Sequence, residues 1–138
     1  MAKKEEKTNV MRILEQKKIP YTAHSYVSTG AISGTEVAEA LGQNPDRVFK
    51  TLVTVAPSKK NYVFVIPVAK ELDLKRAAAS VGEKSVSMIK QAELLPLTGY
   101  VHGGCSPIGM KKFFKTVFDS TAENYEKIIF YVEIYFCW

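Results

Sequence analysis

The sequence predicts a single domain of the mixed α/β (α+β) class, with a mixed sheet that curls like a barrel and is flanked by helices. The first observation is that segments with helical spacing of apolar residues alternate with runs of β-branched and aromatic residues. The second is size, because 138 residues form about one domain that buries roughly two-thirds of its unfolded surface. The third is composition, since 46% hydrophobic and 24% charged residues are ordinary for a globular protein.

Four helices are expected from apolar spacing and from residues that begin or end helices. Ser33 stands three residues before Glu36, a capping box, and Gly42 suits the left-handed end of that helix. Asp73 can cap the next helix. Pro96 is expected to end the last one, because proline disfavours helix continuation. The expected helices cover residues 9–18, 33–42, 74–82 and 91–95.

Strands are expected where β-branched and aromatic residues run between turn signals. Asn44-Pro45 starts one helical turn that leads into a strand at 49–56, and the sequence PSKK forms a turn before an apolar strand at 61–68. These two strands are expected to pair as a hairpin, the second being buried on both faces. Further strands are expected at 98–104, 115–119 and 127–138, with a Ser120/Glu123 capping box before the last.

Charge and cysteine usage limit the class of protein. Nineteen basic and 14 acidic residues give a net charge of +5, which permits a polyanion such as tRNA as partner without requiring one. Cys105 and Cys137 do not form a disulfide framework, and the polar start of the chain is not a signal peptide. No apolar run approaches the roughly 18 residues of a membrane span. A cytoplasmic protein is expected.

The sequence lacks the usual patterns for a metal, a nucleophile or a nucleotide. His24, His102, Cys105 and Cys137 do not have metal-ligand spacing. His102 lies near Cys105 and Ser106, but the elbow and triad patterns of nucleophilic catalysis are absent. The glycine-rich stretch 100–112 also lacks the lysine of a P-loop. We therefore expect neither a metal nor a cofactor.

Two interpretations of this glycine-rich stretch remain. Gly103 and Gly104 have no Cβ, so their amides can approach and bind an anion or a polarised carbonyl. A turn that needs positive φ explains the same residues equally well.

Lys50 is the second candidate, at the start of an apolar strand. Strand alternation places Phe49 and Thr51 on one face and Lys50 on the other. A lysine in this place is most often a surface residue that buries only its stem. On a face that lines a pocket, it offers a positive charge to a carbonyl or a phosphate.

Together, these segments resemble the YbaK/EbsC family of aminoacyl-tRNA deacylases, relatives of the editing domain of bacterial prolyl-tRNA synthetases. The resemblance rests on FKTLV, YVFVIPVAKELDLK, VGEKSVSMI and above all TGYVHGGCSPIGMKK, and it runs from about residue 8 to 130. It implies one mixed α/β domain whose site hydrolyses a wrong amino acid from tRNA.

The resemblance also implies roles for individual residues. Lys50 matches the essential lysine of the family and is expected to be catalytic. Relatives that remove alanine carry Asn after this lysine, so Thr51 points to the branch similar to Cys-tRNA(Pro) deacylases. The family supplies no nucleophile, and the thiol of the substrate attacks its own carbonyl, so Cys105 is expected to fill the loop. The positions expected to bind substrate are Tyr26, Thr51, Gly103, Gly104 and Ser106.

The sequence departs from the family near its end. Members usually continue after the strand matching residues 125–130 into a glycine-rich turn, a strand and a closing helix, where this sequence has YVEIYFCW. Within a single domain of residues 1–138, that strand and helix are thus expected to be missing after about 130. Two alternatives stay open: a noncatalytic module that holds tRNA or a synthetase, and a deacylase for another mischarged tRNA such as Ala-tRNA(Pro). Prolyl-tRNA synthetase is a further expected partner.

Overall fold

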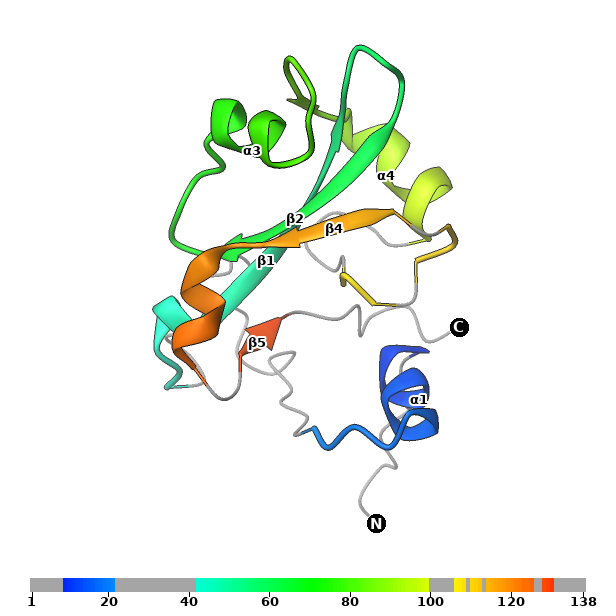
Figure 1. Ribbon diagram of the computed structural model, residues 1–138. Helices are drawn as coiled ribbons and strands as arrows, with labels where there is room; N and C mark the ends of the chain where they lie inside the picture. The colour runs from blue at the N-terminus through cyan, green and yellow to red at the C-terminus, as the bar shows by residue number, and fades with distance from the viewer. Residues whose placement is uncertain are drawn as a thin grey trace.

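The computed structural model describes residues 9–21, 42–99, 106–108, 110–112, 114–125 and 128–130. Figure 1 shows a central sheet with helices on both of its faces. The helices are α1 (Asn9–Gln16), α3 (Leu74–Ser80) and α4 (Gln91–Thr98), with the 3-10 helices η2 (Pro45–Arg47) and η3 (Ser120–Asn124). The strands are β1 (Val48–Val55), β2 (Asn61–Pro67), β3 (Ser87–Met88), β4 (Lys115–Phe118) and β5 (Ile129–Phe130).

The sheet is mixed, with the strand order β3-β1-β2-β4 and with β5 added beside β1. The pairs β1–β2 and β1–β3 are antiparallel, whereas β2–β4 and β1–β5 are parallel. The predicted mixed class is therefore confirmed. The described strands form an open sheet, because β3 and β4 at its two ends do not pair with each other, so the expected barrel-like closure is not seen in this part of the chain.

The hairpin β1–β2 is the centre of the fold, as predicted. Every residue of β2 after Asn61 is buried, which agrees with the expected burial on both faces of the sheet. The turn between the strands places Lys59 at φ 73°, a left-handed conformation that is unusual for a residue other than glycine. Asn44 accepts a hydrogen bond from the amide of Asp46 at 3.0 Å, so the predicted cap before β1 is confirmed.

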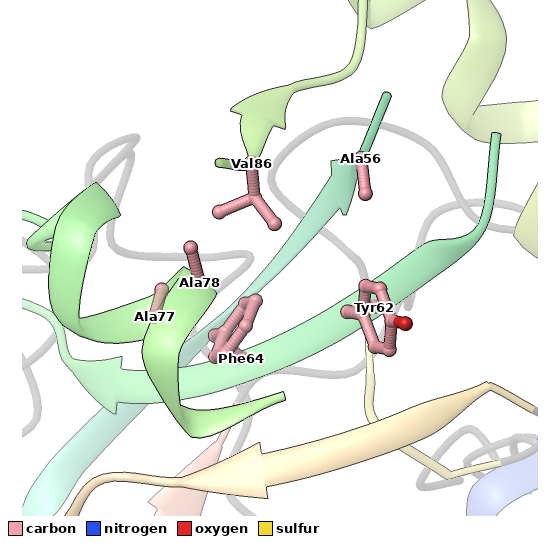
Figure 2. Close-up of a cluster of buried hydrophobic side chains, with 6 residues drawn as sticks. All are labelled: Ala56, Tyr62, Phe64, Ala77, Ala78 and Val86. Atoms are coloured by element: carbon pink, nitrogen blue, oxygen red, sulfur yellow. The ribbon is translucent and has the colours of Figure 1, made fainter. Parts of the chain in front are cut away.

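Two hydrophobic clusters cover opposite faces of the hairpin. On one face, Ala77 and Ala78 of α3 pack against Phe64 and Tyr62 of β2, and Figure 2 shows Phe64 beside the two alanines. The cluster on the other face consists of Val53, Val63 and Leu94, with partly buried Leu14, Ile89, Ile108, Met110 and Phe114 packed against it. We call the two sides the α3 face and the α4 face.

Two predicted helix boundaries can be compared with the structure. Asp73 caps α3, because its carboxylate accepts the amides of Lys75 and Arg76. Pro96 was expected to end α4, and this was wrong, since α4 continues through it to Thr98. The Thr98 hydroxyl donates to the carbonyl of Leu94 at 2.8 Å, and left-handed Gly99 ends the helix. These contacts hold the turn after Pro96, so residues 98–99 do not start the strand predicted there.

Other predicted features are only partly described. The carboxylate of Asp119 caps η3 by accepting the amide of Thr121 at 3.1 Å, so the capping residue is Asp119 and not the predicted Ser120. Gly42 has the left-handed φ of 67° expected of it. Its helix at 33–42 with the Ser33/Glu36 capping box, the remainder of the strand at 98–104 and residues 131–138 lie outside the described residues.

Candidate functional site

Strand β1 carries Lys50 and Thr51, two of the predicted site residues. The register pairs Lys50 with Ile66 and Thr51 with Val65. Thr51 therefore shares the α4 face with Val53, and Lys50 lies on the opposite face of the strand. The predicted alternation is confirmed, and a ligand that contacts both side chains has to approach β1 along its edge.

The hydrogen bonds of the hairpin decide which edge the backbone of Thr51 faces. The amide of Val68 donates to the carbonyl of Val48 at 2.8 Å, and the amide of Ala56 donates to the carbonyl of Lys60 at 2.9 Å. Even-numbered residues of β1 thus bond to β2. Odd-numbered residues, Thr51 among them, direct their N–H and C=O groups toward the other edge of β1.

That other edge of β1 is only partly paired. Strand β5 pairs with residues 48–49, and β3 pairs with residues 54–55. Between β5 and β3, residues 50–52 pair with β2 alone among the described strands, and no described strand lies against them at this other edge. The peptide groups of Thr51 therefore face a gap in the sheet, where they can bond to a ligand.

The hydroxyl of Thr51 is a buried polar group that no described residue pairs with. Its Oγ1 is shielded from solvent and has no hydrogen-bond partner in the described part of the chain. Thr54, three residues along the same strand, instead donates to the carbonyl of Tyr62 at 3.0 Å. Leaving such a hydroxyl unpaired costs about 1–3 kcal/mol, so a buried orphan of this kind needs an explanation. A polar ligand in the gap supplies one.

Lys50 contributes the positive charge of the site. Its side chain is half-buried, and it makes no ion pair or hydrogen bond with any residue that the structure describes. A lysine that the fold does not use for its own pairing can direct its ammonium group toward a ligand. Lys50 and Thr51 thus bring a cation and a hydroxyl to one short stretch of β1.

Ser106 belongs to a firmly built part of the glycine-rich loop. It is completely buried, and its Oγ accepts the amide of Ile108 at 3.1 Å, which closes a local turn. Ile108 and Met110 pack against the cluster of the α4 face. The second half of the loop is therefore anchored on the same face of the sheet that Thr51 occupies.

The structure describes three of the predicted site residues. Tyr26, Gly103 and Gly104 lie outside the described residues, as do His102 and Cys105. Among the predicted residues, the structure thus places Lys50 and Thr51 together on β1 and Ser106 in the loop segment packed on the α4 face.

Sequence reasoning missed one polar side chain near the start of β1. Gln43 has both amide atoms shielded from solvent and without a partner in the described part of the chain. It precedes η2, the helical turn that leads into β1. No motif marks a single glutamine in this position, so only the burial of its amide identifies it.

The described residues lack the features of two other kinds of site. No helix there is long and apolar enough to cross a membrane. The same residues contain no group of three His, Cys, Asp or Glu side chains arranged to hold a metal ion.

Comparisons with known proteins identify the family of this chain. Residues 30–132 match the aminoacyl-tRNA editing domain family. A candidate Cys-tRNA(Pro)/Cys-tRNA(Cys) deacylase of Enterococcus faecalis, EbsC, is 48% identical over 132 residues, which cover 94% of this chain and 80% of the relative.

Solved structures share the fold. A candidate trans-editing enzyme for prolyl-tRNA synthetase is 27% identical with a TM-score of 0.65, over 74% of this chain and 62% of that chain, less than two thirds of its length. A hypothetical protein at 22% identity has a TM-score of 0.77, covering 88% of this chain and 80% of that one, and shows the fold alone. The family match spans most of the sequence and includes both β1 and the glycine-rich loop, so this chain belongs to the aminoacyl-tRNA editing domain family.

Proposed function

We propose that this protein is a trans-editing deacylase that hydrolyses the ester bond of mischarged Cys-tRNA(Pro). The observation that carries the proposal is the stretch Lys50–Thr51. Within the described chain, it offers a cation without an ion pair, a buried hydroxyl without a partner, and the N–H and C=O groups of Thr51 at an edge where no described strand lies. The 48% identity to a candidate Cys-tRNA deacylase supports both the reaction and the amino acid.

The reaction needs little chemistry from the enzyme, because an aminoacyl ester is already activated. In the proposed mechanism, the thiol of the bound cysteine attacks its own ester carbonyl and forms a cyclic thioester. The bond to the 3′ oxygen of the tRNA breaks, and this oxygen leaves with the proton that the thiol gave up. Water then opens the thioester to free cysteine. The enzyme acts by holding thiol and carbonyl together and by stabilising the charge on oxygen.

Each site residue has a role in this mechanism. The ammonium group of Lys50 stabilises the negative charge that develops on the carbonyl oxygen. The Thr51 hydroxyl and its peptide groups position the amino acid along the edge of β1. The amides of Gly103 and Gly104 are proposed as further donors to the ester, with Tyr26 completing the pocket. Ser106 supports them by fixing the turn that follows the glycines.

The natural partner follows from the substrate. Prolyl-tRNA synthetase produces the mischarged tRNA, and a relative of similar fold is described as a candidate trans-editing enzyme for that synthetase. We propose that this protein receives its substrate from the synthetase in the cytoplasm.

A deacylation assay with three substrates tests the proposal. We expect fast release from Cys-tRNA(Pro), slow release from Ala-tRNA(Pro) and none above background from Pro-tRNA(Pro). Preference for Ala-tRNA(Pro) would overturn the amino-acid assignment and leave the reaction class. Binding of tRNA without release of any amino acid would overturn the proposal that the protein is an enzyme, and it would favour a noncatalytic binding module.

A further inference from the structure

A second group of charges lies at the far end of the hairpin, away from Lys50. Four exposed lysines come from three segments: the β1–β2 turn, the loop after α3 and the start of β4. Figure 1 shows the turn and the loop after α3 next to each other at the top of the view, and the register places the start of β4 beside the start of β2. We call these residues the hairpin-tip patch: Lys59, Lys60, Lys84 and Lys115.

Specific contacts bring the segments of this patch together. The hydroxyls of Ser58 and Tyr62 both donate to Oε2 of Glu83, at 2.9 and 2.6 Å. They tie the turn to the loop that contains Lys84. The register of β2 with β4 places Lys115 directly opposite Tyr62. The four lysines thus belong to segments that meet at the contact of Ser58 and Tyr62 with Glu83.

The charge of the patch is not balanced by the fold. Glu83 is the only acidic residue in the contacts that define it, and its carboxylate already accepts two hydroxyls. Within the described chain, none of the four lysines forms an ion pair. Four positive charges and one negative charge leave a local net charge of +3. Two other lysine pairs, Lys17-Lys18 and Lys111-Lys112, differ from this patch, because no contact in the described structure joins one pair to the other.

The distance from the candidate site limits what the patch can bind. Ala56, next to the turn, follows Lys50 by six residue positions along β1 and its end, and a strand rises about 3.3 Å per residue, so the two lie roughly 20 Å apart. An amino acid esterified at the site cannot reach that far. The body of the RNA that carries it can.

We infer that the hairpin-tip patch binds backbone phosphates of the tRNA, beyond the 3′ end whose ester is hydrolysed. This inference rests on the proposed function and assigns the surface that receives the RNA. Phosphate contacts position a nucleic acid without reading its sequence, so the patch contributes affinity and leaves amino-acid selectivity to the site on β1.

Two matched triple variants test this inference. The patch variant is Lys59→Asn, Lys84→Gln and Lys115→Gln, which keeps Lys60 because its charge acts on Glu83. The control is Lys18→Asn, Lys17→Gln and Lys112→Gln. Both sets remove three exposed lysines, and each replaces one lysine of positive φ by asparagine, which tolerates that conformation.

We expect the patch variant to bind tRNA more weakly and with less dependence on salt. The slope of log Kd against log salt concentration should fall by about two to three, at roughly 0.7–0.9 per lost phosphate contact. KM for Cys-tRNA(Pro) should rise, with turnover of cysteine esterified to adenosine alone unchanged. The control variant should change the slope by less than one unit. Equal slopes for the two variants, or a lost turnover of the adenosine ester in the patch variant, would overturn the inference.

The test also separates this inference from the proposed function. If the wild-type protein hydrolyses neither substrate, the deacylase assignment fails, and the binding of uncharged tRNA still compares the two variants. If hydrolysis is normal and the patch variant binds tRNA as tightly as the control, only the assignment of the RNA surface fails.

Discussion

The two ends of strand β1 use similar residues in opposite ways. At the hairpin end, Thr54 donates to the carbonyl of Tyr62, whose own hydroxyl donates to Glu83. At the other end, neither the buried hydroxyl of Thr51 nor the neighbouring ammonium group of Lys50 has a partner among the described residues. One end has its polar groups satisfied by the fold, and the other has them available to a ligand.

This difference indicates how a binding position can be recognised on a strand whose sequence is apolar along most of its length. A buried polar group without a partner lowers stability, so an orphan in a well-paired sheet marks a position where another requirement prevails. Here the orphan coincides with the gap between β3 and β5. The firm hairpin end holds the register, and that register fixes the positions of Lys50 and Thr51.

The largest expected effect is at the unpaired end. Lys50→Ala should lower kcat/KM for Cys-tRNA(Pro) on the order of a hundredfold, because a charge that stabilises the reacting oxygen is lost. The melting temperature should stay unchanged, since the side chain is half-buried and pairs with no described residue. Lys112→Ala, an exposed lysine away from β1, is the control and should keep full activity. Unchanged turnover in Lys50→Ala would rule this lysine out as catalytic.

The two threonines of β1 allow a direct comparison of stability. Thr54→Val should cost about 1 kcal/mol, because a buried hydrogen bond to Tyr62 is lost. Thr51→Val should be neutral or stabilise by up to about 1 kcal/mol, since an unpaired hydroxyl is replaced by a methyl group of similar shape. Its deacylation rate should nevertheless fall. Urea denaturation measures both free energies of unfolding, and equal losses in the two variants would contradict the contrast between the ends of β1.

The hydrogen bonds at the hairpin end predict a dependence of stability on pH. Donation from Tyr62, and then from Ser58, lowers the pKa of Glu83 below its ordinary value of 4.5. A carboxylate with a lowered pKa in the folded state stabilises the fold above the pKa of the unfolded chain, and this contribution is lost as the pH falls through the folded value. In the same contact, the pKa of Tyr62 is raised above 10.0, so its contribution is lost as the pH rises through that higher value.

Tyr62→Phe tests this dependence by removing the largest cause of the Glu83 shift. At neutral pH the variant should melt below the wild type, and the difference should shrink as the pH falls below 4.5. Tyr125→Phe is the control, because it keeps the ring that lies 5.6 Å from the Arg47 guanidinium. A difference between wild type and Tyr62→Phe that stays constant from pH 7 to acid would show that Glu83 is not the titrating group.

The smallest expected effect is at Cys105, which lies outside the described residues. Cys105→Ala should retain most of the deacylase activity, since the proposed mechanism uses the thiol of the substrate and no thiol of the enzyme. Gly104→Val in the same loop should be far worse, because a β-branched side chain restricts φ and fills the space next to the backbone. An inactive Cys105→Ala, together with a trapped covalent enzyme intermediate, would replace substrate-assisted hydrolysis by nucleophilic catalysis.

The sequence by itself determined the parts of this protein that depend on neighbouring residues. The hairpin follows from two apolar runs around PSKK, and the alternation of Lys50 and Thr51 follows from the geometry of a strand. The cap at Asp73 has the same local origin. The candidate site residues were predicted from the family resemblance, because it matches whole motifs of this sequence to those of the family.

Tertiary structure decided what depends on segments distant in sequence. Helix α4 passes through Pro96 because contacts beyond the proline hold its last turn, and these outweigh the local preference to stop. Among the described strands, the gap beside residues 50–52 arises because β3 and β5 pair with β1 on either side of it. The residues FKTLV do not predict where these two strands pair. The hairpin-tip patch likewise needs three segments folded together. Pairing and burial are sums over the whole chain, so only the folded structure shows which polar groups they leave unsatisfied.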